Sequence, residues 1–301
     1  MPRILIIDKG YGRLGNTLYR LCNLIAFSVD NNCIVLDFSM TINRYSKYFP
    51  NICSRLFLTF PHSLNLPFSA LFIHKLQLMI FRFIRTLYSF TIYRKDNSEV
   101  YLKGVLSDTN SNFIILRHFH FTADDSVRRH ADLLRKLFTP SKIILKKVQD
   151  KFNELSQFYD YFIAVHIRHG DYKAFRNGLY FYDENHYAQI MKKTEKLIPN
   201  KKVLFLIFSD SNGLNLSSFS DMNFYIPNTE KSLMFDWYMM SLCNLIIATN
   251  NTTYSGWASF YGEVPIFRLS KNNYPRSLSD FHFDAILNNS DEYIHSSTIL
   301  R

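Results

Sequence analysis

The sequence predicts an α/β protein with two domains, each built on a parallel sheet. With 301 residues, the chain is long enough for two domains of ordinary size. Apolar strand-like runs alternate with helical stretches, which is typical of parallel strands joined by crossover helices. Near the middle, Thr139 followed by Pro140 resembles a helix start, with threonine as the N-cap. We therefore place the domains at residues 1–139 and 140–301.

The individual elements follow from hydrophobic periodicity and from the residues that begin and end helices. In the first half we expect strand 3–8, a glycine-containing loop over 9–15, helix 16–31, strands 33–37, 99–104 and 113–117, and helix 124–138. In the second half we expect helix 141–157, strand 161–167, helix 183–197, strand 203–208, helix 231–242, strand 245–249 and helix 255–261. The sequence from residue 270 onward is poorly patterned.

Composition narrows the class of partner and the compartment. Hydrophobic residues make up 47% of the chain, which is typical of a globular protein, and the formal net charge of +10 favours acidic partners. The four cysteines form no CxxC pair, which indicates a reducing, cytoplasmic compartment. The N-terminus lacks the long apolar run of a signal peptide and is expected to be the first strand.

Residues 64–93 form a basic, apolar stretch that we do not expect to cross a membrane. Charged residues interrupt it before about 20 apolar residues accumulate. On a helix, His74, Lys75, Arg82 and Arg85 fall on one side, which suits peripheral contact with the anionic inner face of a membrane. A partly buried helix with a solvated basic face fits the same pattern, so both interpretations stay open.

Polar clusters follow four predicted strands, at 9–16, 168–172, 209–212 and 250–255. The carboxyl ends of parallel strands share one edge of a sheet, which is where α/β proteins bind ligands. We therefore expect an anionic, phosphate-bearing ligand there, a nucleotide in particular.

The segment after strand 161–167 carries the strongest signal. His166, Arg168 and Gly170 alternate with the strand period, so that the two side chains point to one side while glycine leaves room for a ligand. A guanidinium in this position can bind phosphate oxygens in bidentate fashion. The alternative is an arginine at a strand end that pairs with Asp171 on the surface.

The other clusters are weaker signals. Gly12, Gly15 and Asn16 belong to a glycine loop that can hold phosphate at a helix N-terminus, and Asp37 lies where a dinucleotide fold would place its ribose-binding acid. A tight turn without a ligand also fits this loop. Asp210 can bind ribose or base edges, or can cap a turn.

Two further groups complete the candidate residues. Thr253 and Ser255 can offer hydroxyl groups and helix amides to phosphate, and Ser255 can equally be an N-cap. His118 and His120 alternate on a strand, but no Asp, Glu or Cys pattern accompanies them. We therefore expect no metal site.

Three segments together resemble the fucosyltransferase superfamily, closest to the α1,2-fucosyltransferases of glycosyltransferase family 11. Gly12-Arg-Leu-Gly15-Asn16 resembles the opening GGLGNQ loop of that family, and His166-Ile-Arg168-His-Gly170-Asp171-Tyr resembles its HxRRxDY motif. The segment from Asp236 through Asn250-Asn-Thr-Thr-Tyr-Ser255-Gly-Trp resembles its C-terminal region. The order and spacing of these segments span most of the chain.

The resemblance implies a GT-B fold, in which two Rossmann-like domains face each other across a cleft. It implies GDP-fucose as the donor, a glycan or glycolipid acceptor, and no separate cofactor or metal. By position in the family motifs, Arg168 would stabilise the diphosphate, while His166 and Asp171 would support its loop. The remaining donor-binding positions would be Gly12, Gly15, Asn16, Asp210, Thr253 and Ser255.

Departures from the family leave alternatives open. Arg13, Thr17 and His169 replace a glycine, a glutamine and the second arginine of the family motifs, so the donor can also be another nucleotide sugar. Asp8, Asp37 and Asp171 are the candidate general bases. A histidine phosphatase would share Arg168-His169-Gly170 but continues differently, and a basic nucleic-acid-binding protein would show a denser Lys/Arg stripe.

Overall fold

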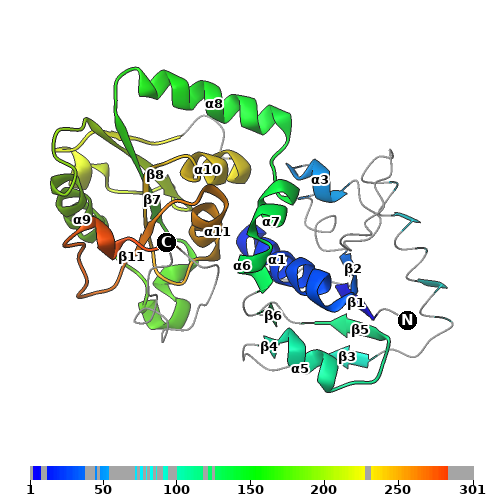
Figure 1. Cartoon of the computed structure of the whole chain (residues 1–301). Helices are drawn as coiled ribbons and strands as arrows, with labels where there is room; N and C mark the ends of the chain where they lie inside the picture. Colours follow the sequence, from blue (N-terminus) through cyan, green and yellow to red (C-terminus); the bar gives the residue numbers. More distant parts are fainter. Residues whose placement is uncertain are drawn as a thin grey trace. The chain divides into compact units, whose positions relative to one another are not determined.

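The computed structural model of this chain forms two compact units, 1–141 and 142–301, each with its own parallel sheet (Figure 1). It describes residues 3–7, 12–37, 45, 48–53, 72, 75–76, 79, 82–83, 86, 91–93, 100–117, 121–123, 126–227 and 232–283. The α/β class that the sequence predicted is confirmed. The predicted domain boundary lies two residues before the division between the units.

The first unit is built on a four-stranded parallel sheet in the order β2-β1-β5-β3. Its strands are β1 (Ile4–Ile7), β2 (Ile34–Asp37), β3 (Thr91–Tyr93) and β5 (Phe113–Leu116). The long helix α1 (Leu14–Asn31) is almost entirely buried in its first four turns, and it packs on β2 and on the short strand β6 (Phe121–Thr122). Strand β6 pairs with the equally short β4 (Val100–Tyr101).

Two predictions for the first unit were wrong in detail. The strand expected at 99–104 is limited to Val100–Tyr101, because helix α5 (Leu102–Ser107) begins directly afterwards and buries Leu102 and Val105, three residues apart. The helix expected at 124–138 is divided into α6 (Ser126–Arg129) and α7 (Ala131–Leu137). The division falls where Arg129 and His130 both contact Asp30 of α1.

Other parts of the first unit were missed from the sequence. The short helix α3 (Pro50–Cys53) was not predicted. Strand β3 occupies the end of the stretch expected to be a basic helix, and the seven described residues before it, between 72 and 86, are helical. Among the described residues, no helix is long and apolar enough to cross a membrane.

The second unit is a doubly wound parallel sheet in the order β9-β8-β7-β10-β11. Its strands are β7 (Tyr161–Ile167), β8 (Val203–Ser209), β9 (Phe224–Tyr225), β10 (Leu245–Ala248) and β11 (Ile266–Arg268). The chain winds outward from β7 to β9 and then returns to β10 on the other side of β7. The topological switch point, where α/β sheets bind ligands, therefore lies between β7 and β10.

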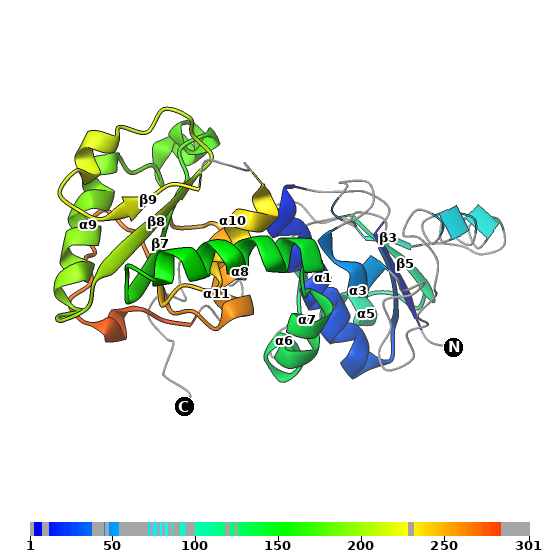
Figure 2. The same cartoon turned by 90° about the horizontal axis from the view of Figure 1, so that it is seen from above.

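Helices cover both faces of this sheet (Figure 2). Alternate residues of β7, such as Ile163 and Val165, pack in the core with residues of α9 (Glu184–Lys196). Residues of the opposite set, such as Phe162 and His166, pack against aromatic rings of α8 (Lys142–Ser156) and α11 (Thr253–Gly262). Helix α10 (Leu233–Met240) packs against both α8 and α11.

Most elements of the second unit match their predictions, because strands β7, β8 and β10 consist almost entirely of apolar residues. Strands β7, β8 and β10 and helices α9, α10 and α11 agree with their predicted bounds within two residues at every end. The edge strands β9 and β11, which have two and three residues, were missed. The short 3₁₀ helices are η2 (Asp171–Lys173), η3 (Phe175–Gly178), η4 (Leu216–Phe219) and η5 (Leu278–Asp280).

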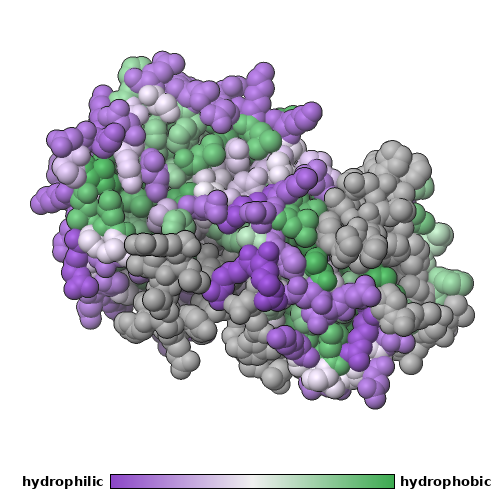
Figure 3. Space-filling model, viewed as in Figure 1, coloured by the Kyte–Doolittle hydropathy of each residue, from purple (hydrophilic) through white to green (hydrophobic). Residues whose placement is uncertain are grey.

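The start of α8 differs from the prediction. The helix begins at Lys142. The Thr139 hydroxyl donates hydrogen bonds to the carbonyl oxygens of Arg135 and Lys136, in the preceding helix, so Thr139 is not the N-cap of α8. Helix α8 buries Ile144 and Val148, whereas its exposed side is rich in charged residues, consistent with the hydrophilic surface visible in Figure 3.

Candidate functional site

Three strand ends meet at the carboxyl edge of the second sheet. Arg168 directly follows β7, Asp210 follows β8, and Thr249 follows β10. The strands are in register there, since Ala248 of β10 lies beside His166 of β7. The polar clusters expected after these strands are therefore brought together on both sides of the switch point.

Arg168 is held in place by two carboxylates and by the neighbouring strand end. Its Nη1 lies 2.8 Å from Asp210 Oδ2, and its Nη2 lies 2.5 Å from Asp171 Oδ1. Its backbone amide donates to Thr249 Oγ1 at 2.9 Å, and its guanidinium lies 5.5 Å from the centre of the Tyr172 ring. Only 16% of the Arg168 side chain is exposed. The site thus contains a fixed cation at the edge of the sheet.

Asp210 organises the loop that follows β7. Its Oδ1 accepts hydrogen bonds from the backbone amides of His169 at 2.9 Å and Gly170 at 3.1 Å. A Cβ atom on Gly170 would come within 2.3 Å of Asp210 Oδ2, closer than such atoms can approach. Asp210 was expected either to bind ribose or a base edge or to cap a turn. In the structure its carboxylate accepts backbone amides in the manner of a turn cap and fixes the loop around Arg168.

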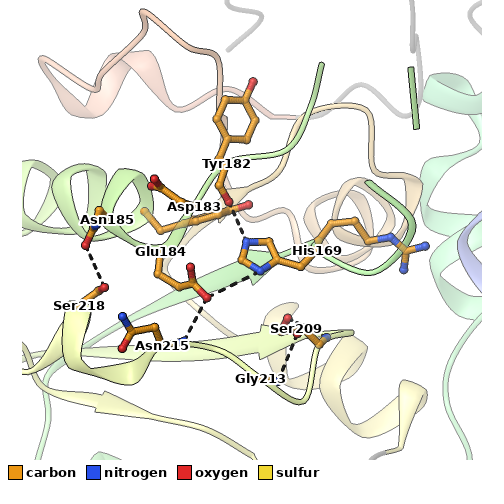
Figure 4. Close-up of polar contacts among 12 residues, drawn as sticks. His169, Tyr182, Asp183, Glu184, Asn185, Ser209, Gly213, Asn215 and Ser218 are labelled. Carbon is orange, nitrogen blue, oxygen red and sulfur yellow. Dashed lines mark hydrogen bonds and ion pairs between the residues drawn. The ribbon is translucent and has the colours of Figure 1, made fainter. Parts of the chain in front are cut away.

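His169 points toward Tyr182 and Glu184, at the start of α9 (Figure 4). Its Nε2 donates to the Tyr182 carbonyl oxygen at 2.7 Å, and its Nδ1 lies 3.8 Å from Glu184 Oε1. The ring is buried and packs 4.7 Å from the centre of the Phe181 ring. Glu184 in turn accepts from the backbone amide of Asn215. His169 therefore packs inside the loop, against Phe181, Tyr182 and Glu184, and does not place a second positive charge beside Arg168.

His166 is buried below the start of α11. Its ring lies 5.4 Å from the ring of Tyr254, and its Nδ1 has no hydrogen-bond partner among the described residues. Burial lowers the pKa of His166 to about 3, and the positive charges of Arg168 and Arg268 contribute in the same direction. The imidazole is therefore neutral at physiological pH.

The N-terminus of α11 closes the site beside β10. Thr252 is the N-cap residue, its hydroxyl donates to the Thr249 carbonyl at 2.9 Å, and Ser255 Oγ lies 2.6 Å from Thr252 Oγ1. Ser255 is fully buried in the first turn of α11, so it is not the N-cap, and its hydroxyl group is hydrogen-bonded to Thr252 and not exposed. Thr253, the first residue of α11, is partly exposed. The Tyr172 hydroxyl donates to the Asn251 carbonyl and ties the β7 loop to this turn.

Comparisons with known proteins identify the fold. No family model matches the sequence, and no curated protein matches it. Solved structures do match: the NodZ α-1,6-fucosyltransferase soaked with GDP-fucose, a protein from Bradyrhizobium, has a TM-score of 0.58 at 13% identity over 93% of this chain and 97% of that chain. A FUT1 mutant of Arabidopsis thaliana in complex with GDP has a TM-score of 0.54 at 12% identity, over 91% and 72%.

The fold is that of the GT-B fucosyltransferases. The GT-B fold that the sequence motifs implied is thereby confirmed. In this GT-B chain, Arg168, Asp171 and Asp210 come together in the second unit, with His166 and Thr253 at the same edge of the sheet.

Gly12, Gly15 and Asn16 lie in the first unit of the GT-B fold, at the start of α1. The helix begins at Leu14, two residues before the prediction, so Gly15 and Asn16 lie inside its first turn. Gly12 has a positive φ of 70°, and a Cβ atom there would come within 2.4 Å of the Asn16 side chain. This glycine is needed for the turn into α1. Residues 9–11, which complete the predicted loop, lie outside the described part of the chain.

The remaining candidates give no metal site in the described ranges of this GT-B chain. No three His, Cys, Asp or Glu side chains gather there in a way that could hold an ion, and His118 and His120 lie outside those ranges. Asp37 is buried at the end of β2. Asp8 also lies outside the described residues.

The sequence analysis gave no role to three residues near the site. Thr249 receives the Arg168 amide and lies 2.5 Å from the hydroxyl of buried Tyr187. Arg268 ends the unpredicted strand β11 and donates to the Thr252 carbonyl. Asp236, in the first turn of α10, is largely buried, and burial raises its pKa to about 7. Arg268 could have been found only by predicting β11, whose three residues carry too short a pattern.

Proposed function

We propose that this protein is an inverting glycosyltransferase that transfers L-fucose from GDP-fucose to a hydroxyl group of a glycan or glycolipid. The observation that carries the proposal is the fixed guanidinium of Arg168 at the switch point of the second sheet. Cations at this edge suit the diphosphate of a nucleotide sugar. The structural neighbours include an α-1,6-fucosyltransferase soaked with GDP-fucose and a FUT1 mutant in complex with GDP, which supports the same donor.

The proposed reaction is a single displacement. The acceptor oxygen forms a bond to the anomeric carbon of fucose on the face opposite GDP, while the bond from that carbon to the diphosphate oxygen breaks. The electron pair of the broken bond stays on GDP, and the hydroxyl proton is released. Arg168 would neutralise the negative charge that develops on the diphosphate. Such prearranged charge is often the largest catalytic contribution, and one lost donor costs about 10²–10³ in rate.

The linkage is proposed on the sequence motifs alone. The three segments resemble α1,2-fucosyltransferases, whereas the structural neighbour NodZ is an α-1,6-fucosyltransferase, so the likeness in fold does not decide the linkage. We propose an α1,2 linkage on the strength of the HxRxGDY segment at His166, Arg168, Gly170 and Asp171. No separate cofactor or metal is part of the proposal.

The first experiment is a thermal-shift panel of GDP-fucose, GDP, GDP-mannose, UDP-glucose and NAD, followed by a transfer assay with glycan acceptors. A ligand that binds only the folded state raises the melting temperature by mass action. We expect selective stabilisation by GDP-fucose and GDP. In the transfer assay, Arg168→Lys and Arg168→Ala should lower the rate by about 10²-fold or more. Arg276→Ala, at an exposed arginine outside the site, is the matched control and should retain the activity.

The outcomes separate the alternatives. A response to UDP-glucose, GDP-mannose or NAD alone would assign another donor or the dinucleotide interpretation. Full activity of Arg168→Ala would contradict the role of Arg168. Nucleic-acid binding that weakens with rising salt, without turnover of any nucleotide sugar, would indicate a basic nucleic-acid-binding protein and contradict the proposed enzyme activity.

We also propose that the stretch 64–93 contacts an anionic membrane surface. Its large apolar residues Phe72, Met79 and Phe83 are 49%, 61% and 65% exposed. With Leu76, they fall within about 60° of one another on a helix, and the exposed Lys75 and Arg82 flank them on one side. An apolar stripe with a basic flank fits a helix lying in the headgroup region of a membrane.

This contact can be tested by co-sedimentation with vesicles of phosphatidylcholine containing or lacking phosphatidylserine. The protein should bind the anionic vesicles, and Met79→Ser combined with Phe83→Ser should abolish the binding. Phe158→Ser removes a phenylalanine that is 61% exposed in the second unit and serves as the matched control. Equal binding of the double variant would contradict the proposal.

A further inference from the structure

Arg268 lies in the same row of the second sheet as His166. Ala248 of β10 is paired with both residues, with His166 of β7 on one side and Arg268 of β11 on the other. Side chains of residues paired across a sheet point to the same face. The His166 ring packs against Tyr254 of α11, so Arg268 also points toward the α11 face. Its Nη1 donates to the carbonyl oxygen of Thr252, the N-cap of α11, at 3.3 Å.

Arg268 is also close to the surroundings of Arg168. The positive charges of both guanidinium groups act to lower the pKa of the same two side chains, His166 and Tyr172. They approach from opposite sides of the switch point, since Arg168 follows β7 and Arg268 ends β11 beyond β10. His166 Nδ1, which is buried in the same row, lacks a hydrogen-bond partner among the described residues. A buried polar atom without a partner points to a ligand in this region.

The charge balance around Arg168 requires another cation if an anion is to bind. Arg168 is paired with both Asp171 and Asp210, so these three side chains carry a formal net charge of −1. A diphosphate is multiply negative, so the guanidinium of Arg168 does not balance its charge alone. His169 cannot supply the missing charge at this place, because it is turned toward Tyr182 and Glu184. Arg268 brings the sum of the four side chains to zero, and the N-terminus of α11 adds partial positive charge.

We propose that Arg268 is the second guanidinium that binds the donor diphosphate, opposite Arg168 and beside the N-terminus of α11. This inference rests on the proposed function, because it takes a nucleoside diphosphate sugar as the ligand. In this chain, His169 replaces the second arginine of the motif after β7. The edge strand β11 would supply the second cation instead, through Arg268.

The test is calorimetric titration of the full-length protein with GDP, GMP and guanosine. Arg268→Gln should weaken GDP binding by about 10- to 100-fold, as expected for a lost hydrogen bond to a charged group. GMP binding should weaken less, and guanosine binding should not change. Arg268→Lys keeps the charge without the planar fork and should fall between the wild type and Arg268→Gln. Arg276→Gln, at an exposed arginine eight positions further on, is the matched control.

Each outcome supports or overturns the inference. Unchanged GDP affinity of Arg268→Gln, in a protein whose wild type binds GDP, would overturn the role of Arg268 and leave the proposed function standing. Equal losses for GDP and guanosine, together with a lower melting temperature of the variant, would show that Arg268 only holds the Thr252 turn and would also overturn it. A wild type that binds neither GDP nor GDP-fucose would overturn the proposed function and this inference with it.

Discussion

The backbone amide of Gly170 donates to Asp210 Oδ1 at 3.1 Å, and no other residue type can stand at position 170 without striking the same carboxylate. The loop after β7 and the end of β8 are joined through this contact. The second oxygen of Asp210 holds Arg168. One carboxylate therefore sets both the backbone of the loop and the position of its cation, and the absence of a side chain at Gly170 makes this possible.

Replacing Gly170 with alanine should disrupt this junction. The added methyl group would lie within 2.3 Å of Asp210 Oδ2, and overpacking of this kind costs roughly 1–3 kcal/mol. The expected result is a lower free energy of unfolding, measured by urea denaturation, and weaker GDP binding. Gly213→Ala is the control, because a Cβ atom at Gly213 meets open space. Identical stability and GDP binding of the two variants would refute the argument.

The two carboxylates that hold Arg168 should differ in their contribution to stability. In Asp210→Asn, the remaining oxygen can still accept the loop amides, but the new amide group then faces Arg168 donor to donor. We expect a loss of roughly 1–3 kcal/mol in the free energy of unfolding. Asp171 is 56% exposed, so Asp171→Asn should change stability by less than about 1 kcal/mol. The free energy of unfolding of both variants is measured by chemical denaturation. Equal losses would contradict the expectation that the more buried carboxylate, Asp210, contributes more to stability.

The second unit was predictable from the sequence because its central strands are long and apolar. Strand β7 carries seven residues and is buried apart from its first, so the bounds could be read directly from the sequence. The first unit was harder where its described elements are very short, since α5 follows the two-residue strand β4 without a break. Such short runs do not distinguish a strand from one helical turn, and tertiary packing decides between them.

The site was predictable only where polar residues directly follow a recognised strand. Arg168, Asp171 and Asp210 satisfied that condition, and the structure brings them together. The burial of Ser255 could not be foreseen, because a serine near the start of a helix that follows a strand can be either buried in the first turn or exposed to a ligand. Arg268 was missed because β11 was missed.

His166 should make stability depend on pH below neutrality. Its pKa is lowered by burial from 6.5 to about 3, so the unfolded chain binds a proton that the folded protein excludes. This contribution is complete above pH 6.5 and is lost as the pH falls toward 3, by up to about 1.4 kcal/mol per pH unit. His166→Gln removes the titration. If the slope of stability against pH between 5 and 6.5 is the same in this variant as in the wild type, the buried imidazole is not the cause.

Asp236 should act in the opposite direction over an overlapping range. Burial raises its pKa from 3.8 to about 7, so the folded protein holds a proton that the unfolded chain releases. The stability from the protonated carboxyl group is complete below pH 3.8 and is lost as the pH rises toward 7. Between 3.8 and 6.5 the contributions of His166 and Asp236 therefore nearly cancel in the wild type.

Removing either group should reveal the other. Asp236→Asn should become more stable as the pH rises from 4 to 6.5, and His166→Gln should become less stable over the same range. Each slope should approach about 1.4 kcal/mol per pH unit, since one proton is exchanged on unfolding. The double variant should lose both contributions and follow the flat profile of the wild type. Urea denaturation at a series of pH values measures all four proteins, and slopes of the same sign in the two single variants would contradict the opposed titration of these buried groups.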